Sequence, residues 1–292
     1  MTDTHYAPPV DKLLTMGETD LMDPENWPDY LALGIGPEHI PDLLRMVVDE
    51  ELNDPEAEGS EIWAPVHALR MLGQLRDEST IQPLLQILGD SQGNEWVEEE
   101  MPGVFGLIGP AAIPALSEYL ADASHDEYTR GNAADALTNI ADRHPESRTV
   151  SIQALTRTLE QYEVNGYDLN SFIIYDLARL KAVDTLPLIE KAFEAEMVEE
   201  FFIDLDYVLV LMGLKEPESE LPSSFEELAS RFLNLPTPKY NPSDFEIVNH
   251  GFPDDENAPI VDSLPVRASR PVREFKPIKF SRNKSKKKKK RR

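Results

Sequence analysis

The sequence contains no cysteine among its 292 residues. This absence excludes a disulfide framework, a catalytic thiol and a zinc site with cysteine ligands. It also has no run approaching about 18 consecutive apolar residues, the length that a membrane-spanning helix needs. The first twenty residues have no basic start followed by an apolar run, so no secretory signal is expected there. We therefore expect no membrane insertion and a cytoplasmic location, or a nuclear one in a eukaryotic source.

Basic residues are scarce everywhere except at the C-terminus. The net charge is −26, and residues 267–292 carry 14 of the 28 lysines and arginines with a single acid. This tail has a charge of +13, whereas residues 1–266 together have a charge of −39. So acidic a body is a poor surface for nucleic acid. The tail, in contrast, has the composition of a polyelectrolyte arm.

A short phrase recurs along the chain: a small residue at a helix end, a turn, and then an apolar residue, a proline and a leucine. Proline suits the first turn of a helix because its missing N–H has no intrahelical partner there. The equivalent positions are spaced by 42, 31, 39 and 34 residues, which suits two helices per unit. These positions are Pro41, Pro83, Pro114, Gln153 and Pro187.

The helical spacing of apolar residues predicts five pairs of helices, the first helix of each pair beginning at the recurring phrase. The second helices are expected near residues 61–75, 96–108, 128–141, 169–181 and 199–212. Pro102 falls inside one of them, and we expect a kink or break near Met101 because an internal proline removes a hydrogen bond.

The composition divides the chain into five segments. Their boundaries follow from the onset and end of the periodic pattern and from the proline and charge content. A capping-box signature begins at Ser223, and the segment after it is rich in proline, which is typical of a disordered region. The segments are a lead-in at 1–36, helix pairs at 37–214, a linker with a capping helix at 215–233, a Pro-rich acidic linker at 234–266 and the basic tail at 267–292.

The repeated phrase resembles HEAT repeats, and more closely the short bacterial form named after phycobilisome lyases. The likeness is carried by LGQLRD at 72–77, by LIGPAAIP at 107–114, and by Asp122 with Arg130. It implies an all-α fold, a right-handed α-solenoid of about five HEAT-like helix pairs with a disordered C-terminal region. It also implies that the second helices line one concave surface. Proteins of this kind include scaffolds, lyases and nucleic-acid-binding proteins, so the resemblance alone does not select an activity.

No catalytic motif is present, and we expect neither enzymatic activity nor a cofactor. The six histidines do not occur at metal-binding spacing with carboxylates around them, so no metal site is expected. Gly103, Gly106 and Gly109 are three residues apart, but no strand precedes them and no Lys-Ser or Lys-Thr follows. They indicate close helix packing rather than a phosphate loop.

The second helices instead carry carboxylates with interspersed aromatic residues. If these helices line a groove, that groove is acidic with aromatic anchors, and it suits a basic or helical segment of a partner protein. The alternative interpretation is a solvated charged face over a core of aromatic side chains. The predicted groove residues are Trp63, His67, Trp96, Glu98, Glu99, Asp176, Glu199, Glu200 and Asp204.

The basic tail is the second candidate for an interaction. Its first basic residues recur every third position with prolines between them, so a polyproline II conformation would align them in one stripe. The tail suits nucleic acid or the ribosome, a nuclear-import function, or self-contact with the acidic groove. The charged residues concerned are Arg267, Arg270, Arg273, Lys276, Lys279, Arg282, Lys286, Lys287, Lys288, Lys289, Lys290, Arg291 and Arg292.

The leading hypothesis is thus a non-enzymatic scaffold or adaptor that binds protein in its acidic groove and is tethered or regulated by its tail. The resemblance to phycobilisome lyases leaves a bilin lyase or a lyase-like chaperone as one alternative. Such a protein needs basic residues for the propionates of a bilin, and Arg70, Arg130 and Arg179 are the few candidates. A nucleic-acid- or ribosome-associated factor acting through the tail alone is the other alternative.

The hypothesis of a nucleic-acid- or ribosome-associated factor makes a direct prediction about the tail. Binding to nucleic acid through residues 267–292 is expected to weaken steeply as salt concentration rises, because phosphate neutralisation releases counterions. Deletion of these residues is expected to abolish the binding. Fluorescence anisotropy with labelled RNA and DNA at several salt concentrations measures both effects, and affinity that survives the deletion contradicts the hypothesis.

Overall fold

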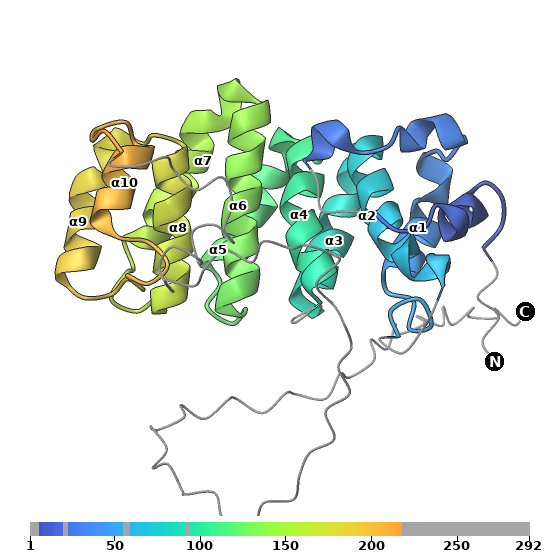
Figure 1. The fold of residues 1–292 in the computed structure, drawn as a ribbon, viewed down its shortest axis with the longest axis horizontal. Coiled ribbons are helices and arrows are strands. Elements are labelled where there is room, and N and C mark those ends of the chain that lie inside the picture. Colours follow the sequence, from blue (N-terminus) through green and yellow to red (C-terminus); the bar gives the residue numbers. More distant parts are fainter. Residues whose placement is uncertain (1–5, 20–22, 55–58, 91–93, 218–292) are drawn as a thin grey trace, which may run out of the picture. The chain divides into compact units, whose positions relative to one another are not determined.

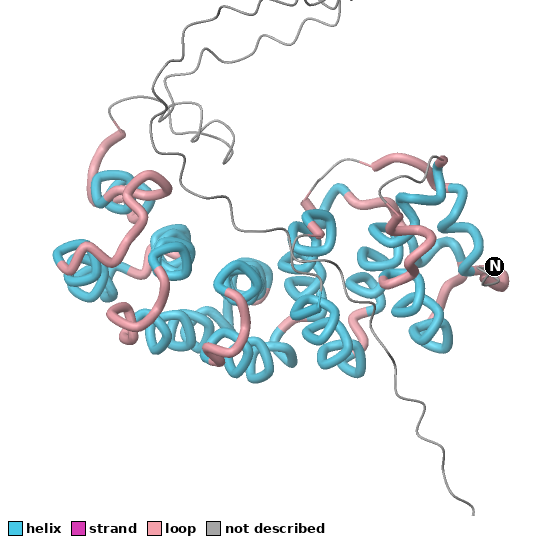
Figure 2. Tube along the Cα trace, turned by 90° about the horizontal axis from the view of Figure 1, so that it is seen from below, coloured by secondary structure: helices cyan, strands magenta, loops and turns pink. Residues whose placement is uncertain are grey.

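The computed structural model describes residues 6–19, 23–54, 59–90 and 94–217. These belong to one compact unit, Met1–Leu221; the other unit, Pro222–Arg292, lies outside the described residues. The predicted capping helix, the Pro-rich linker and the basic tail therefore stay predictions. Within the described ranges every regular element is helical and no strand occurs, which confirms the predicted all-helical character (Figure 2).

The α-helices follow one another in chain order from α1 to α10 (Figure 1). The odd-numbered helices are the first helices of the predicted pairs, and the even-numbered helices are the second helices, a name kept below. The bounds are α1 Ile40–Val47, α2 Ala64–Leu75, α3 Ile81–Asp90, α4 Glu95–Ile108, α5 Ile113–Ala121, α6 Glu127–Arg143, α7 Arg148–Leu159, α8 Tyr167–Arg179, α9 Leu186–Glu194 and α10 Leu205–Leu211.

A short 3-10 turn precedes each first helix and gives the recurring phrase its structural meaning. Pro41, Pro114 and Pro187 lie in the first turns of α1, α5 and α9, as the fixed φ of proline predicts. From α3 onward the chain thus alternates between a 3-10 turn with a first helix and a loop with a second helix, whereas α2 is also preceded by a 3-10 turn. The turns are η4 Pro37–His39, η6 Glu78–Thr80, η7 Pro110–Ala112, η8 Pro145–Ser147 and η9 Val183–Thr185.

The second helices pack successively on one another, α2 on α4, α4 on α6, α6 on α8 and α8 on α10. A glycine lies at each of the first three interfaces and permits a close approach. A Cβ atom on Gly73 would lie 3.2 Å from Cα of Val104, and one on Gly106 would lie 3.0 Å from Cβ of Asn139. The apolar side chains between the helices form one continuous buried cluster.

The structure differs from two sequence predictions about the second helices. A kink or break was expected near Met101, and α4 continues without a break through Pro102 from Glu95 to Ile108. α10 begins at Leu205 rather than near residue 199, because the side chain of Asp204 accepts a hydrogen bond from the N–H of Tyr207 at 2.7 Å and caps the helix. Residues 199–202 form a turn before it.

The N-terminal segment, defined as the described residues between 6 and 36, is packed against the helix pairs. It contains three short 3-10 helices, η1 Val10–Thr15, η2 Pro24–Asn26 and η3 Tyr30–Leu33. η1 and η3 contact α2, and η2 contacts α4. The segment places six apolar or aromatic side chains in the common core, namely Tyr6, Val10, Leu13, Trp27, Tyr30 and Ile35.

Buried polar groups hold the N-terminal segment to α2. Nε2 of His67 lies 2.9 Å from the carbonyl oxygen of Gly17, and Nδ1 lies 2.7 Å from the hydroxyl of Tyr30. Since a carbonyl only accepts, the proton is on Nε2, and Nδ1 accepts from Tyr30. Burial is the main cause that lowers the pKa of His67, and the charge of Arg70 adds to it.

A buried ion pair lies next to this histidine. Arg70 of α2 donates two hydrogen bonds to the carboxylate of Glu100 on α4, one of them from Nε at 3.0 Å, and a third to the hydroxyl of Thr19 at 2.7 Å. Both side chains of the pair are almost fully buried. Their charges satisfy each other and join two second helices with the N-terminal segment.

Removing one partner of this pair leaves an uncompensated buried charge. We expect Arg70→Met to lower the free energy of unfolding by about 3–5 kcal/mol. The double variant Arg70→Met/Glu100→Leu is expected to recover much of this loss, because it removes both charges. Urea unfolding followed by circular dichroism measures the differences. Arg157→Met, at an exposed position of α7, is the matched control and is expected to stay within about 0.5 kcal/mol. Equal losses in the single and double variants would contradict the assignment.

Candidate functional site

The predicted groove residues fall into three groups in the structure. The first is an aromatic pair at the start of α2 and α4. Trp63 ends the 3-10 turn η5 (Ser60–Trp63), Trp96 is the second residue of α4, and their rings meet edge to face with centroids 4.7 Å apart. Trp96 is 41% exposed. In the following turn of α4, Glu98 is half-buried and Glu99 is exposed, so this end carries aromatic and acidic side chains together.

The second group consists of residues that the structure withdraws from the surface. His67 is 2% exposed and is held by Tyr30 and Gly17, and Asp176 is also 2% exposed. Both side chains are therefore covered by neighbouring residues rather than presented on the surface. The helical spacing placed both on plausible faces, but the elements that cover them come from distant parts of the chain.

The third group lies between α9 and α10. Glu199 and Glu200 are exposed in the turn before α10, and the N–H of Glu199 donates to Oγ of Ser171 on α8 at 2.9 Å. That bond fixes the turn against α8. Asp204 caps α10, which accounts for its carboxylate without a partner protein.

A row of aromatic side chains, which the sequence prediction had largely missed, crosses α6, α8 and the turn before α10. Tyr128 of α6 lies 5.7 Å from Phe172 of α8 between ring centroids, and Phe202 lies 5.3 Å from Phe172 and 6.0 Å from Tyr175. These four residues are called the aromatic row below. Tyr128 is 53% exposed and the other three are half-buried, so the row has both contact area and fixed geometry.

Local structure explains how the row is positioned. The side chain of Asp126 caps α6 by accepting from the N–H of Tyr128 at 2.9 Å, and the Tyr128 hydroxyl donates to Asp168 of α8 at 3.2 Å. Phe172 packs over Gly131, where a Cβ atom would lie 2.6 Å from its ring. On α8, Asp168, Phe172 and Tyr175 follow at i, i+4 and i+7 and share one face.

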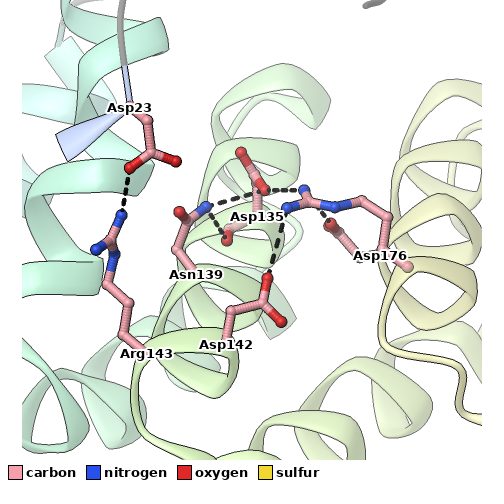
Figure 3. Close-up of polar contacts among 7 residues, drawn as sticks. Asp23, Asp135, Asn139, Asp142, Arg143 and Asp176 are labelled. Atoms are coloured by element: carbon pink, nitrogen blue, oxygen red, sulfur yellow. Dashed lines mark hydrogen bonds and ion pairs between the residues drawn. The ribbon is translucent and has the colours of Figure 1, made fainter. Parts of the chain in front are cut away.

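The same faces of α6 and α8 continue into a cluster of charged residues (Figure 3). Arg179, one turn after Tyr175, donates to Oδ1 of Asp135 on α6 at 2.8 Å. Its guanidinium also lies 3.7 Å from Oδ2 of Asp142 and 3.6 Å from Oδ1 of Asp176. Three carboxylates therefore surround one cation, and Asp135, Asp142, Asp176 and Arg179 are called the carboxylate cluster below.

Asp176 is the unusual member of the carboxylate cluster. Burial is the main cause that raises its pKa well above the usual value, and the negative charges of Asp135 and Asp142 add to this effect, while Arg179 and the hydroxyl of Thr138 oppose it. Its Oδ1 nevertheless has no hydrogen-bond partner of good geometry among the described residues, and the same is true of Oγ1 of Thr138 on α6. A buried acceptor in this state lowers stability.

The arginines proposed for a bilin are all engaged within the protein. Arg70 is fully buried on Glu100, Arg130 is 5% exposed and donates from Nε to the carbonyl oxygen of Leu120, and Arg179 is held by Asp135. No group of three or more histidine or carboxylate side chains suited to a metal ion occurs in the described part of the chain.

In the described ranges no single helix is both long and apolar enough to cross a bilayer, although one bent pair, Trp96–Ile108 with Pro110–Ala121, satisfies the criteria of length and composition.

The raised pKa of Asp176 predicts a pH dependence of stability. Between the unfolded value of about 3.9 and the raised native pKa, the folded state binds more protons than the unfolded state. The free energy of unfolding contributed by Asp176 therefore falls as the pH rises through this window. Asp176→Asn removes the penalty and is expected to gain about 1 kcal/mol at pH 8, or about 2–4 °C in Tm. Thermal unfolding followed at pH 4 and pH 8 tests this, with no gain expected at pH 4. A loss of stability at pH 8 would contradict it.

Comparison with known proteins gives one finding that bears on identity. A family model described as a protein of unknown function, DUF1186, matches residues 38–223, which is more than half of the chain. Neither the curated proteins nor the solved structures contain a significant match. The matched range includes the ten α-helices of the described residues, and with them the aromatic row and the carboxylate cluster. The chain therefore belongs to the DUF1186 family.

Proposed function

We propose that this protein is a non-enzymatic scaffold that binds a basic segment of a partner protein on its second helices. The proposal takes the helix pairs as a HEAT-like α-solenoid. The regular succession of a 3-10 turn, a first helix and a second helix supports this view, as does the stepwise packing of α2, α4, α6 and α8. In such an array each pair contributes one second helix to a common surface.

The single observation that carries the proposal is the aromatic row with its acidic surroundings. Aromatic side chains on α6, α8 and the turn before α10 contact one another across elements that are far apart in sequence. Their ring positions are fixed by packing, so little conformational entropy is lost when a partner covers them. Aromatic anchors of this kind dominate the binding energy of many protein interfaces.

The charges around the row select the type of partner. Asp168 lies beside Tyr128, Asp135 and Asp142 lie farther along α6, and Glu199 and Glu200 lie in the adjoining turn. This surface attracts cations and repels nucleic acid and other acidic molecules. A partner segment with lysine or arginine residues and at least one apolar side chain complements both features.

Selection from a random peptide library tests the proposal, because the library samples every combination of basic, acidic and apolar residues. A display library of 16-residue peptides is selected against the full chain, and the affinity of the enriched peptides is measured by fluorescence anisotropy. We expect enrichment of sequences that combine basic and apolar residues, with affinity that decreases as salt concentration rises. Tyr128→Ala is expected to weaken binding about tenfold, in the range of an aromatic anchor.

A matched control separates this surface from general surface effects. Val150 of α7 is 50% exposed, and Val150→Ala is expected to leave the affinity unchanged. Equal effects of Tyr128→Ala and Val150→Ala, or enrichment of acidic peptides, would refute the proposed surface.

A further inference from the structure

We propose that the carboxylate cluster is the subsite that takes up a cationic side chain, an arginine or a lysine, from the segment bound at the aromatic row. The inference rests on the proposed function and assigns one position within it. It concerns Asp135 and Asp142 on α6 and Asp176 and Arg179 on α8 (Figure 3).

The charge balance of the cluster is the first argument. Arg179 is at hydrogen-bonding distance from Asp135 alone, at 2.8 Å, while its contacts with Asp142 and Asp176 are 3.7 Å and 3.6 Å long. The guanidinium of Arg179 therefore compensates the charge of Asp135 well and the charges of Asp142 and Asp176 poorly. The side chain of Asp142 is 56% exposed, so a second cation can reach it from solvent.

The buried oxygen of Asp176 is the second argument. Its Oδ1 accepts no hydrogen bond of good geometry among the described residues, although its side chain is only 3% exposed. A cation that binds Asp142 and Asp135, whose side chains are 56% and 38% exposed, competes with Arg179 for these two carboxylates. Arg179 is then able to close on Asp176 at hydrogen-bonding distance, which satisfies the buried acceptor. Ligand binding thereby corrects a defect that the free protein carries.

The distance from Tyr128, the exposed member of the aromatic row, to the carboxylate cluster is the third argument. Tyr128 and Asp142 are 14 residues apart on α6, which is about 21 Å along the helix axis at 1.5 Å per residue. An extended segment covers this distance with about six or seven residues. The ring of Tyr175, also a member of the aromatic row, lies 5.7 Å from the Arg179 guanidinium and is half-buried, so it offers a surface for the aliphatic part of an arginine or lysine.

Arg143, which follows Asp142 on α6, already binds carboxylates of another segment through ion pairs. Arg143 pairs with Asp23 at 2.9 Å (Figure 3). It also lies 3.9 Å from Glu25, and both carboxylates belong to the N-terminal segment. A segment of this chain is thus already held at this level of α6 by ion pairs. Next to Arg143, the carboxylate cluster presents negative charge, which suits a segment that supplies a lysine or arginine.

The test compares two substitutions that remove the same charge. Asp142→Asn changes the cluster, and Asp184→Asn changes an exposed aspartate in the turn before α9. Fluorescein-labelled nona-arginine and nona-lysine are titrated with the full-length variants at 150 mM salt, where long-range attraction is screened. We expect Asp142→Asn to weaken binding about five- to tenfold, as for the loss of a charged hydrogen bond, and Asp184→Asn to weaken it less than twofold. Unchanged thermal unfolding shows that both variants are folded.

A second measurement follows the buried carboxylate. When Arg179 closes on Asp176, its positive charge favours the ionised form of the Asp176 carboxyl. Binding of nona-arginine is therefore expected to release a proton from Asp176. Isothermal titration calorimetry in two buffers of different ionisation enthalpy detects this release, and Asp176→Asn is expected to abolish it.

The outcomes separate this inference from the proposed function. Equal effects of Asp142→Asn and Asp184→Asn, or no binding of either probe to the wild type, would overturn the cation subsite. The proposed function is judged separately, by the effect of Tyr128→Ala on library-selected peptides. Selected peptides that respond to Tyr128→Ala but not to Asp142→Asn would retain the surface and reject the subsite.

Discussion

Glycines at the interfaces between second helices set how closely these helices approach, and the candidate surface depends on that distance. Gly73, Gly106 and Gly131 each face a neighbouring second helix at a separation that leaves no room for a relaxed Cβ atom. Phe172 fills the space over Gly131 and is thereby brought within reach of Tyr128. Larger residues at these positions would separate the helices, and the contacts of the aromatic row and of Arg179 with Asp135 would be lost.

The buried pair of Arg70 and Glu100 and the buried carboxyl of Asp176 differ in how far neighbouring groups offset the free-energy cost of burial. Glu100 is almost fully buried and receives two hydrogen bonds from Arg70, which oppose the effect of burial, although burial still raises the pKa of Glu100. Asp176 is equally buried, yet its Oδ1 accepts no hydrogen bond of good geometry among the described residues and its nearest cation is shared with two other carboxylates. The first arrangement is understandable as structure alone. The second lowers stability, which is the pattern expected where a site is kept ready for a ligand.

The sequence predicted the helices well because their signals are local. Proline and apolar residues mark the starts of α1, α5 and α9, and helical periodicity marks α4, α6 and α8 within a few residues. The start of α10 was missed because a local competitor, the cap at Asp204, overrode the periodicity. The break predicted at Pro102 is absent because packing of α4 between α2 and α6 sustains the helix.

The candidate site was less predictable because it depends on contacts between distant segments. Periodicity places His67 on a helix face but gives no sign that Tyr30 and Gly17 will cover it, since the N-terminal segment has weak periodicity. Phe172 meets Phe202 only after α9 has returned the chain to α8. A signal for the row was nevertheless present, because Asp168, Phe172, Tyr175 and Arg179 repeat at i, i+4, i+7 and i+11. Their shared face pairs with Tyr128 and Asp135 of α6.

In the proposed function, recognition at two points, Tyr128 and the carboxylate cluster, lets so acidic a surface select its partner. Charge alone attracts any basic segment and is screened by salt, so it supplies association rate more than specificity. In this proposal the aromatic row adds a contact that requires an apolar side chain, and the carboxylate cluster adds one that requires a cation at a fixed distance from Tyr128. A segment that satisfies only one of these contacts leaves either the rings exposed or the oxygen of Asp176 unsatisfied. The spacing between Tyr128 and Asp142 along α6 is then the criterion that distinguishes one basic segment from another.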